Sequence, residues 1–342
     1  MRYLGNKSRI SQNIIDLALE LSPTCRVIAD PFGGSGAAAR ALKATGAAIY
    51  TNDLLSSSYF LLTAGVCANV VPRFKRFKTR YGNDPFTWLS TPSSDLASFA
   101  KLRTVVQERY SQSAGRLYFT DANAILIDGA REAINKFRED GLISKFEHDY
   151  LIGCLIAASS KVANTTGTFG AFLKTWEARA LKPLTIQPLE FVNNHKKNFA
   201  YNLQATEFLR DKHFNVIYID PPYNARQYLS NYHVLEAIAC KQVPQSKGVS
   251  GAFLDATKKS AFCSKRTVRA AFEELFSVCD SDSLIVSYSS ESLLPESELE
   301  NLIKSWGKPS TFNIERIKFQ RYQNIKAREQ TVFELLLSIR RS

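Results

Sequence analysis

The sequence predicts a doubly wound α/β fold, with a mostly parallel sheet that carries an antiparallel hairpin at its carboxyl-terminal edge. Short apolar runs alternate with helical patterns at both ends of the chain, which is the rhythm of βαβ units. The apolar runs are followed by acidic residues at Asp30, Asp53 and Asp220, where open α/β sheets bind ligands. Two final strand-like runs, 313–322 and 331–339, predict the hairpin.

The first 53 residues predict one strand–turn–helix–strand unit. Apolar residues at helical spacing predict an opening helix that ends before Pro23, namely Ile10, Ile14, Leu17 and Leu21. The apolar run 26–29 predicts a buried strand that leads into a glycine-rich turn. An alanine-rich helix should then end at Gly46, before a second strand at 47–51.

The chain changes character after residue 66. The next residues are basic, aromatic or rich in Ser and Pro, and helical patterns follow at about 121–138 and 144–161. We therefore expect a main domain formed by residues 1–66 and 196–342. A mainly helical insertion, 67–195, should interrupt it.

The carboxyl-terminal part returns to the α/β rhythm. We expect strands at 214–219 and 284–288, and a helix between them with one apolar face. That face carries Val268, Ala271, Phe272, Leu275 and Phe276. Another helix should open at Pro295 and end at Gly307.

The charge of the chain favours a polyanionic partner. The 342 residues carry a formal net charge of +12 and a pI near 9.4, and a surplus of Lys and Arg can displace counterions from phosphates. A merely basic soluble protein is the alternative. The six cysteines show no CxxC spacing and the four histidines are scattered, so we expect no metal site, no disulfide framework and a cytoplasmic location. We also expect no signal peptide and no membrane span.

The turn after the first strand suits a nucleoside ligand. Gly33, Gly34 and Gly36 have no side chain to obstruct close approach of the backbone, and Ser35 can cap the next helix. Asp53 lies 19 residues beyond Gly34 and can accept hydrogen bonds from ribose hydroxyls. The turn is not a GxGxxG, and no Lys-Ser/Thr follows it, so a nucleoside-triphosphate loop is disfavoured. A tight turn without a ligand is the alternative.

The segment Asp220-Pro221-Pro222-Tyr223 follows a predicted strand and suits transfer to a ring-conjugated amino group. Asp220 and the Pro221 carbonyl offer two acceptors, and Tyr223 offers a ring for base stacking. Two acceptors that hold the amino hydrogens would favour a pyramidal nitrogen whose lone pair faces an electrophilic methyl group. The remaining rate enhancement would come from proximity and in-line orientation of the two reactants. A base in a duplex would have to flip out to reach the site. A proline-stiffened strand exit is the alternative.

Three segments carry a resemblance to a known family: RYLGNK at Arg2–Lys7, DPFGGSG at Asp30–Gly36, and DPPYNARQYLSNYHVLEAIA at Asp220–Ala239. With them the chain resembles the adenine-specific DNA methyltransferases of the D12-type (Dam-like) class, in which cofactor motifs precede the catalytic motif. The resemblance covers about residues 1–66 and 200–342. It implies a Rossmann-like methyltransferase sheet, S-adenosylmethionine as cofactor, no metal, and double-stranded DNA as substrate.

The resemblance also implies roles for single residues. Residues that would close over the methionine end of the cofactor are Tyr3, Gly5, Asn6 and Lys7. Residues that would line its pocket are Asp30, Pro31, Phe32, Gly34, Ser35, Gly36 and Asp220, with Asp53 on the ribose. Gln204 stands where the family often has an acidic residue on the adenine. The catalytic motif would be Asp220, Pro221, Pro222 and Tyr223, and its aspartate favours adenine over cytosine.

Candidate DNA contacts come from basic residues, mostly in the insertion 67–195, which we expect to recognise the target. The stretch 73–80 alternates basic and aromatic residues, and its basic members are Arg73, Lys75, Arg76, Lys78 and Arg80. A solvated edge with its phenylalanines turned inward is the alternative. Lys174 lies in a polar, glycine-containing stretch. Downstream of the catalytic motif a second basic group contains Lys258, Lys259, Lys265, Arg266 and Arg269.

The sequence thus predicts a site-specific DNA adenine methyltransferase of a restriction–modification or related system. A methyltransferase of an RNA base is the nearest alternative, and a non-catalytic DNA-binding module is another. A nicotinamide-dependent oxidoreductase would need the missing GxGxxG. We expect a monomer or weak dimer, and a cognate restriction endonuclease is a possible partner.

Overall fold

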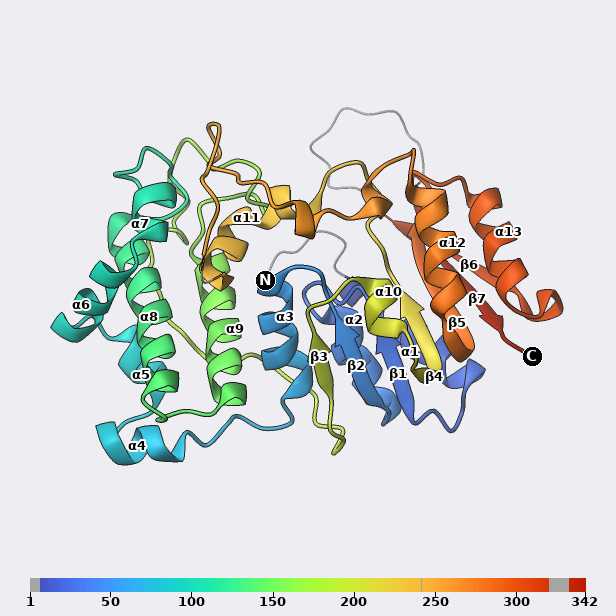
Figure 1. Ribbon diagram of the computed structural model, residues 1–342, viewed down its shortest axis with the longest axis horizontal. Coiled ribbons are helices and arrows are strands. Elements are labelled where there is room, and N and C mark those ends of the chain that lie inside the picture. The colour runs from blue at the N-terminus through green and yellow to red at the C-terminus, as the bar shows by residue number, and fades with distance from the viewer. Residues whose placement is uncertain (1–6, 241, 320–331) are drawn as a thin grey trace.

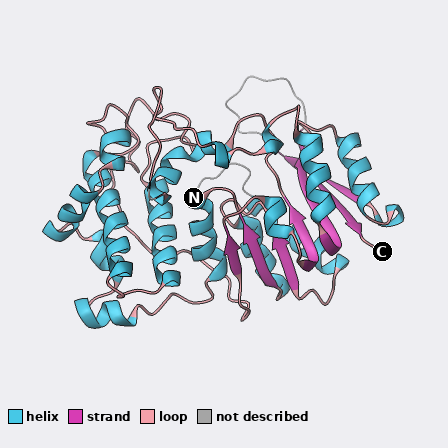
Figure 2. Cartoon of the chain, in the orientation of Figure 1, coloured by secondary structure: helices cyan, strands magenta, loops and turns pink. Residues whose placement is uncertain are grey.

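The computed structural model of the protein describes residues 7–240, 242–319 and 332–342. Figures 1 and 2 show a twisted sheet covered by helices, with a second, helical part beside it. The sheet has seven strands in the order β3-β2-β1-β4-β5-β7-β6. The strands are β1 Val27–Asp30, β2 Ala48–Asn52, β3 Phe199–Tyr201, β4 His213–Ile219, β5 Asp280–Ser289, β6 Asn313–Phe319 and β7 Val332–Arg340.

The strand directions confirm the predicted sheet. Strands β3, β2, β1, β4 and β5 pair in parallel, whereas β7 pairs antiparallel with both β5 and β6. The predicted terminal runs therefore form the expected hairpin, although their portion at 320–331 lies outside the described residues. The strand order reverses between β1 and β4. This is the switch point at which doubly wound sheets bind ligands.

Helices cover both faces of the sheet, as alternation along β4 requires. Val216 and Tyr218 of β4 pack with helices on one face, whereas Ile217 and Ile219 pack with helices on the other. The first face holds α1 Ser11–Leu21 and α2 Ala37–Leu42, and the second holds α10 Ala205–Leu209, α12 Val268–Val278 and α13 Glu296–Trp306. The predicted apolar faces of α1 and α12 contribute buried residues to these two cores.

The second part is a helical layer that packs on α3, Ser56–Leu62. Its helices are α4 Lys75–Tyr81, α5 Pro85–Ser90, α6 Ser94–Leu102, α7 Val105–Tyr110, α8 Asp121–Glu139, α9 Lys145–Lys161 and α11 Tyr228–Ala239. A side chain on Gly153 of α9 would meet the Phe60 carbonyl oxygen at 2.2 Å, so this glycine lets α9 lie directly on α3. Because α11 follows the DPPY segment, this layer is joined directly to the predicted catalytic residues. The boundaries 67 and 195 of the insertion stay a prediction.

The described residues also contain five short 3₁₀-helices and one π-helix, η3. They are η1 Lys7–Arg9, η2 Lys43–Thr45, η3 Thr63–Cys67, η4 Ala256–Lys258, η5 Ala261–Cys263 and η6 Pro309–Thr311. All six cysteines are free thiols. Among the helices of the described ranges, none has the length and apolarity needed to span a membrane.

Candidate active site

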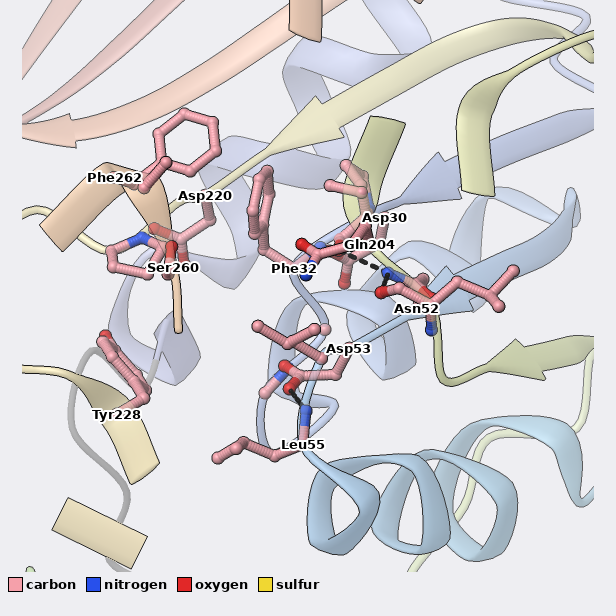
Figure 3. Close-up of a pocket in the computed structure, with 18 of the residues that line it drawn as sticks. Asp30, Phe32, Asn52, Asp53, Leu55, Gln204, Asp220, Tyr228, Ser260 and Phe262 are labelled. Carbon is pink, nitrogen blue, oxygen red and sulfur yellow. Dashed lines mark hydrogen bonds between the residues drawn. The ribbon is translucent and has the colours of Figure 1, made fainter. Parts of the chain in front are cut away.

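A cavity of about 350 Å³ lies at the carboxyl ends of β1, β2 and β4, at the switch point of the sheet. Figure 3 shows Asp220, Tyr228 and Ser260 toward one end of it, and Asn52, Asp53 and Gln204 toward the other. The structure brings to its wall ten of the residues predicted from sequence, namely Lys7, Asp30, Pro31, Phe32, Gly34, Ser35, Asp53, Gln204, Asp220 and Pro222. Gly36, Pro221 and Tyr223 do not line the cavity, although each is adjacent in sequence to a residue that does. Tyr3, Gly5 and Asn6 lie outside the described residues.

The glycine turn between β1 and α2 is shaped by its contacts to the end of β2. The Gly33 amide donates to the Asn52 carbonyl at 2.8 Å, and the Gly34 amide donates to Asp53 Oδ2 at 2.8 Å. A Cβ on Gly33 would meet Thr51 Oγ1 at 2.4 Å. Glycine at 33 is therefore required by packing against the sheet.

The predicted helix cap at Ser35 is wrong. The N-cap of α2 is Gly36, which has a left-handed backbone (φ 78°) and no capping side chain. Gly36 adopts this conformation because glycine has no Cβ to oppose it. The Ser35 carbonyl instead accepts a hydrogen bond from Arg40 at 3.0 Å.

Asp53 accepts two backbone hydrogen bonds at its end of the cavity. Its Oδ2 accepts from the Gly34 amide, and its Oδ1 accepts from the Leu55 amide at 2.8 Å. Burial raises the pKa of Asp53 to about 6, although these backbone hydrogen bonds oppose the rise. A carboxylate can accept about four hydrogen bonds, so Asp53 keeps capacity for hydroxyl groups of a ligand.

Asp220 belongs to a buried ionic cluster. Lys7 Nζ lies 3.1 Å from Asp220 Oδ1 and 2.5 Å from Glu334 Oε1, and Ser287 Oγ donates to the same glutamate oxygen at 2.7 Å. Burial raises the pKa of Asp220, and the charge of Lys7 opposes that rise. Burial alone would lower the pKa of Lys7, but the attraction of Asp220 and Glu334 outweighs it and leaves the pKa raised.

Asp30 presents an acceptor without a partner. Its Oδ1 accepts from the Phe32 amide at 3.2 Å, whereas its buried Oδ2 has no hydrogen-bond partner among the described residues. Burial, followed by repulsion from Asp220, raises the pKa of Asp30 well above its ordinary value. A buried acceptor left unpaired is destabilising, so this oxygen favours a ligand that donates a hydrogen bond.

Several wall residues were not predicted to belong to this site, and two of them, Lys258 and Lys259, were grouped with the candidate DNA contacts. Phe262 meets Phe32 edge to face at 5.2 Å between ring centroids, and Lys258 and Ser260 lie on the same segment. Gln227 and Tyr228 lay within the quoted DPPY segment, which was their available signal. Glu334 had none, because only the pairing of β7 with β5 brings it to Lys7.

The candidate DNA contacts lie apart from one another. Phe74 and Phe77 are buried, as expected from the alternative in which the phenylalanines of this stretch turn inward. The basic side chains between them, together with Lys174, Lys265 and Arg266, are exposed. Figure 1 shows α4 at the end of the helical layer remote from the loops at the carboxyl ends of the strands. Contacts of these basic side chains with DNA stay a prediction.

The fold is that of a Rossmann-like methyltransferase. The chain belongs to the D12 class of N6 adenine-specific DNA methyltransferases, whose sequence profile matches residues 3–324. The Type II methyltransferase M.FokI of Planomicrobium okeanokoites is 35% identical over 327 residues, 95% of this chain and 50% of that protein. The modification methylase LlaI of Lactococcus lactis subsp. lactis is 33% identical over 94% of this chain and 51% of that protein.

The relatives differ in length. This chain spans about half the length of M.FokI and LlaI. The Type II methyltransferase M.NlaIII of Neisseria lactamica is 28% identical over 345 residues, which is 98% of this chain and 98% of that protein.

Proposed function

We propose that this protein transfers the methyl group of S-adenosylmethionine to the exocyclic N6 amino group of an adenine flipped out of double-stranded DNA. Family membership supports the reaction class and the target base. The observation that carries the proposal is one cavity that joins the ribose-type Asp53 to the DPPY aspartate, Asp220. Such an arrangement suits a nucleoside cofactor and an amino group that lie side by side.

The residues present fit the cofactor. The unpaired Asp30 Oδ2 suits the ammonium group of its amino-acid end, and Asp53 suits the ribose hydroxyls. The glycine turn lets backbone approach the ligand between these two carboxylates. When bound, the cofactor supplies an electrophilic methyl group on a sulfonium centre.

The chain's own residues hold the acceptor amino group. The Asp220 carboxylate and the Pro221 carbonyl accept hydrogen bonds from its two N–H groups, and the fixed backbone of Pro221-Pro222 keeps these acceptors in place. Lys7 lowers the pKa of Asp220 against the effect of burial, which favours the ionised carboxylate, and Lys7 is itself held by Glu334. Because burial raises the pKa of Asp220, its carboxylate can take the proton that leaves the nitrogen as the new N–C bond forms. Tyr223 offers its ring to the flipped base.

Asp220→Ala tests this proposal. We expect the substitution to abolish transfer of tritiated methyl groups to duplex DNA while leaving duplex binding, measured by fluorescence anisotropy, largely unchanged. Undiminished transfer would remove Asp220 from the reaction. Methyl transfer by the unsubstituted protein to ribosomal RNA, with none to duplex DNA, would instead favour the RNA alternative.

The setting proposed here follows from the relatives' printed names, which describe Type II methyltransferases and modification methylases. We place the protein in the cytoplasm as the protective half of a restriction–modification system, beside a cognate endonuclease, and as a monomer or weak dimer. Resistance of its host's DNA to one endonuclease, lost in the Asp220→Ala strain, is the expected sign of that role.

A further inference from the structure

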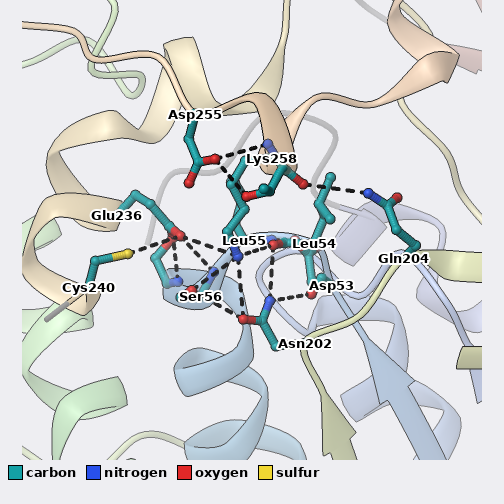
Figure 4. Close-up of polar contacts among 12 residues, drawn as sticks. Asp53, Leu54, Leu55, Ser56, Asn202, Gln204, Glu236, Cys240, Asp255 and Lys258 are labelled. Atoms are coloured by element: carbon teal, nitrogen blue, oxygen red, sulfur yellow. Dashed lines mark hydrogen bonds and ion pairs between the residues drawn. The ribbon is translucent and has the colours of Figure 1, made fainter. Parts of the chain in front are cut away.

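One wall of the cavity is formed by a segment that the catalytic motifs do not account for. This segment, residues 255–263, is here called the strap; it contains η4 and η5 and lies between α11 and α12 in the chain. Figure 4 shows the strap passing over the turn that joins β2 to α3. Two of its residues, Lys258 and Ser260, are fixed by side-chain hydrogen bonds at different ends of the cavity.

Lys258 fixes the strap at the nucleoside end. Its Nζ donates to the Leu54 carbonyl at 2.7 Å, to Ser56 Oγ at 3.2 Å and to Asn202 Oδ1 at 3.4 Å. Leu54 directly follows Asp53, the carboxylate assigned to the ribose. The Lys258 side chain is only 15% exposed, so its charge depends on these acceptors rather than on water.

The acceptors of Lys258 are themselves held in place by a buried carboxylate. Glu236 of α11 accepts from the Ser56 amide at 2.9 Å and from the Ser57 amide at 2.8 Å. Its Oε1 lies 3.9 Å from Lys258 Nζ. Asn202 Nδ2 donates to the carbonyls of Asp53 and Leu54 at 2.8 and 3.0 Å. At this end of the cavity the strap therefore contacts residues that are themselves linked by hydrogen bonds to one another and to the Asp53 carbonyl.

Gln227 fixes the strap at the catalytic end. Its Nε2 donates to the Ser260 carbonyl at 3.0 Å, and its Oε1 accepts from the Ser260 amide at 2.9 Å. Gln227 lies four residues beyond Tyr223 and lines the cavity. The same strap therefore contacts both the residue that follows the DPPY loop, Gln227, and the turn that follows Asp53.

Resting on the proposed function, we infer that Lys258 and Gln227 are positioning residues, and that through the strap they serve different steps of the reaction. Lys258 holds the strap against the nucleoside half of the cofactor, so it governs cofactor affinity. Gln227 holds the DPPY loop against the cofactor wall, so it governs the methyl-transfer step. Neither side chain needs to touch a reacting atom.

The experiment compares Lys258→Met, Lys258→Arg and Gln227→Ala with the unsubstituted chain. Isothermal titration with S-adenosylhomocysteine gives cofactor-site affinity, and steady-state methylation of duplex DNA gives kcat and KM. Lys258→Met should weaken S-adenosylhomocysteine binding about 10- to 100-fold, since it removes charge-assisted hydrogen bonds. Its kcat at saturating cofactor should stay within about threefold of the unsubstituted value, because a loss of binding energy that is shared by the ground state and the transition state raises KM and leaves kcat unchanged. Lys258→Arg keeps the charge and should restore most of the affinity.

Gln227→Ala should show the opposite split, with kcat lowered about tenfold or more and S-adenosylhomocysteine affinity changed less than about threefold. The control is Lys308→Met, which removes an exposed lysine beside β7, away from the cavity, and should leave both quantities unchanged. Thermal unfolding of each variant separates loss of affinity from loss of folding.

Unchanged affinity in Lys258→Met would overturn the inference, as would equal losses in Lys258→Met and Lys258→Arg when both are folded. A Gln227→Ala variant that loses affinity but keeps kcat would also overturn it. Failure of the proposed function looks different. If the unsubstituted chain binds no S-adenosylhomocysteine, both proposals are refuted. If it binds S-adenosylhomocysteine but methylates no DNA, the proposed function is refuted, whereas the predicted effect of Lys258 on cofactor affinity can still be tested.

Discussion

Substitution of Lys7 by Met should move the acidic limit of methyl transfer to higher pH. Transfer needs the ionised Asp220 carboxylate, so activity is lost as pH falls through the pKa of this group. Lys7 Nζ lies 3.1 Å from Asp220 Oδ1 and lowers that pKa against the effect of burial. An opposite charge at this distance typically moves a carboxyl pKa by about 1–3 units, so Lys7→Met should raise the acidic limb by that amount.

Other ionisable groups lie near Asp220. They are Asp30 at the end of β1, Tyr218 of β4, Tyr223, Tyr228 of α11 and Glu334 of β7. Glu334 raises the pKa of Asp220, so Glu334→Gln should move the acidic limb to lower pH, opposite in sign to Lys7→Met. This pair of variants separates an electrostatic effect from a general loss of structure.

The assay is tritium transfer from S-adenosylmethionine to duplex DNA between pH 5.5 and 9.5, at saturating cofactor and DNA. Because Lys7 also lines the cavity, the diagnostic quantity is the position of the acidic limb rather than the maximal rate. On the acidic side, each pH unit of displacement lowers the rate about tenfold at fixed pH. An acidic limb at the same pH in both variants and the unsubstituted chain would refute this role for Lys7.

Three further outcomes follow from the site. Gly33→Ala should lower the free energy of unfolding by about 1–3 kcal/mol in urea denaturation, because its Cβ would lie 2.4 Å from Thr51 Oγ1; an unchanged midpoint would contradict the packing account. Burial raises the pKa of Asp53 to about 6, so S-adenosylhomocysteine affinity should fall as pH drops through 6, and Asp53→Asn should flatten that dependence; a flat profile in the unsubstituted chain would remove Asp53 from the ribose site. Loss of the exposed basic side chains of α4 should reduce the salt slope of duplex binding by about 0.9 for each phosphate contact removed, and an unaltered slope would show that α4 does not contact DNA; these residues are Lys75, Arg76, Lys78 and Arg80.

Local sequence patterns predicted most of the strands and helices of the fold. The apolar runs that precede Asp30 and Asp220 became β1 and β4, and the predicted helices near 121–138 and 144–161 became α8 and α9. Periodicity and strand ends are properties of neighbouring residues, so sequence alone can reveal them. The three-residue strand β3 was not predicted, because a run this short has no distinct periodicity.

Long-range pairings account for what the sequence did not reveal. Lys7 and Glu334 are 327 residues apart, and they meet only because β7 inserts between β5 and β6. Lys258 was grouped with candidate DNA-contacting residues because of its charge, yet its side chain lies inside the protein and donates to the Leu54 carbonyl. In each case the partner of a charged side chain is set by topology, which residue type and spacing do not encode.

The measurement that tests the central claim most directly is genome sequencing with detection of modified bases, after expression in a host that lacks DNA methylation. We predict N6-methyladenine within a single recognition sequence, and its disappearance when the Asp220→Ala variant is expressed instead. A genome without modified adenine, or one in which cytosine carries the new methyl group, would contradict the assignment.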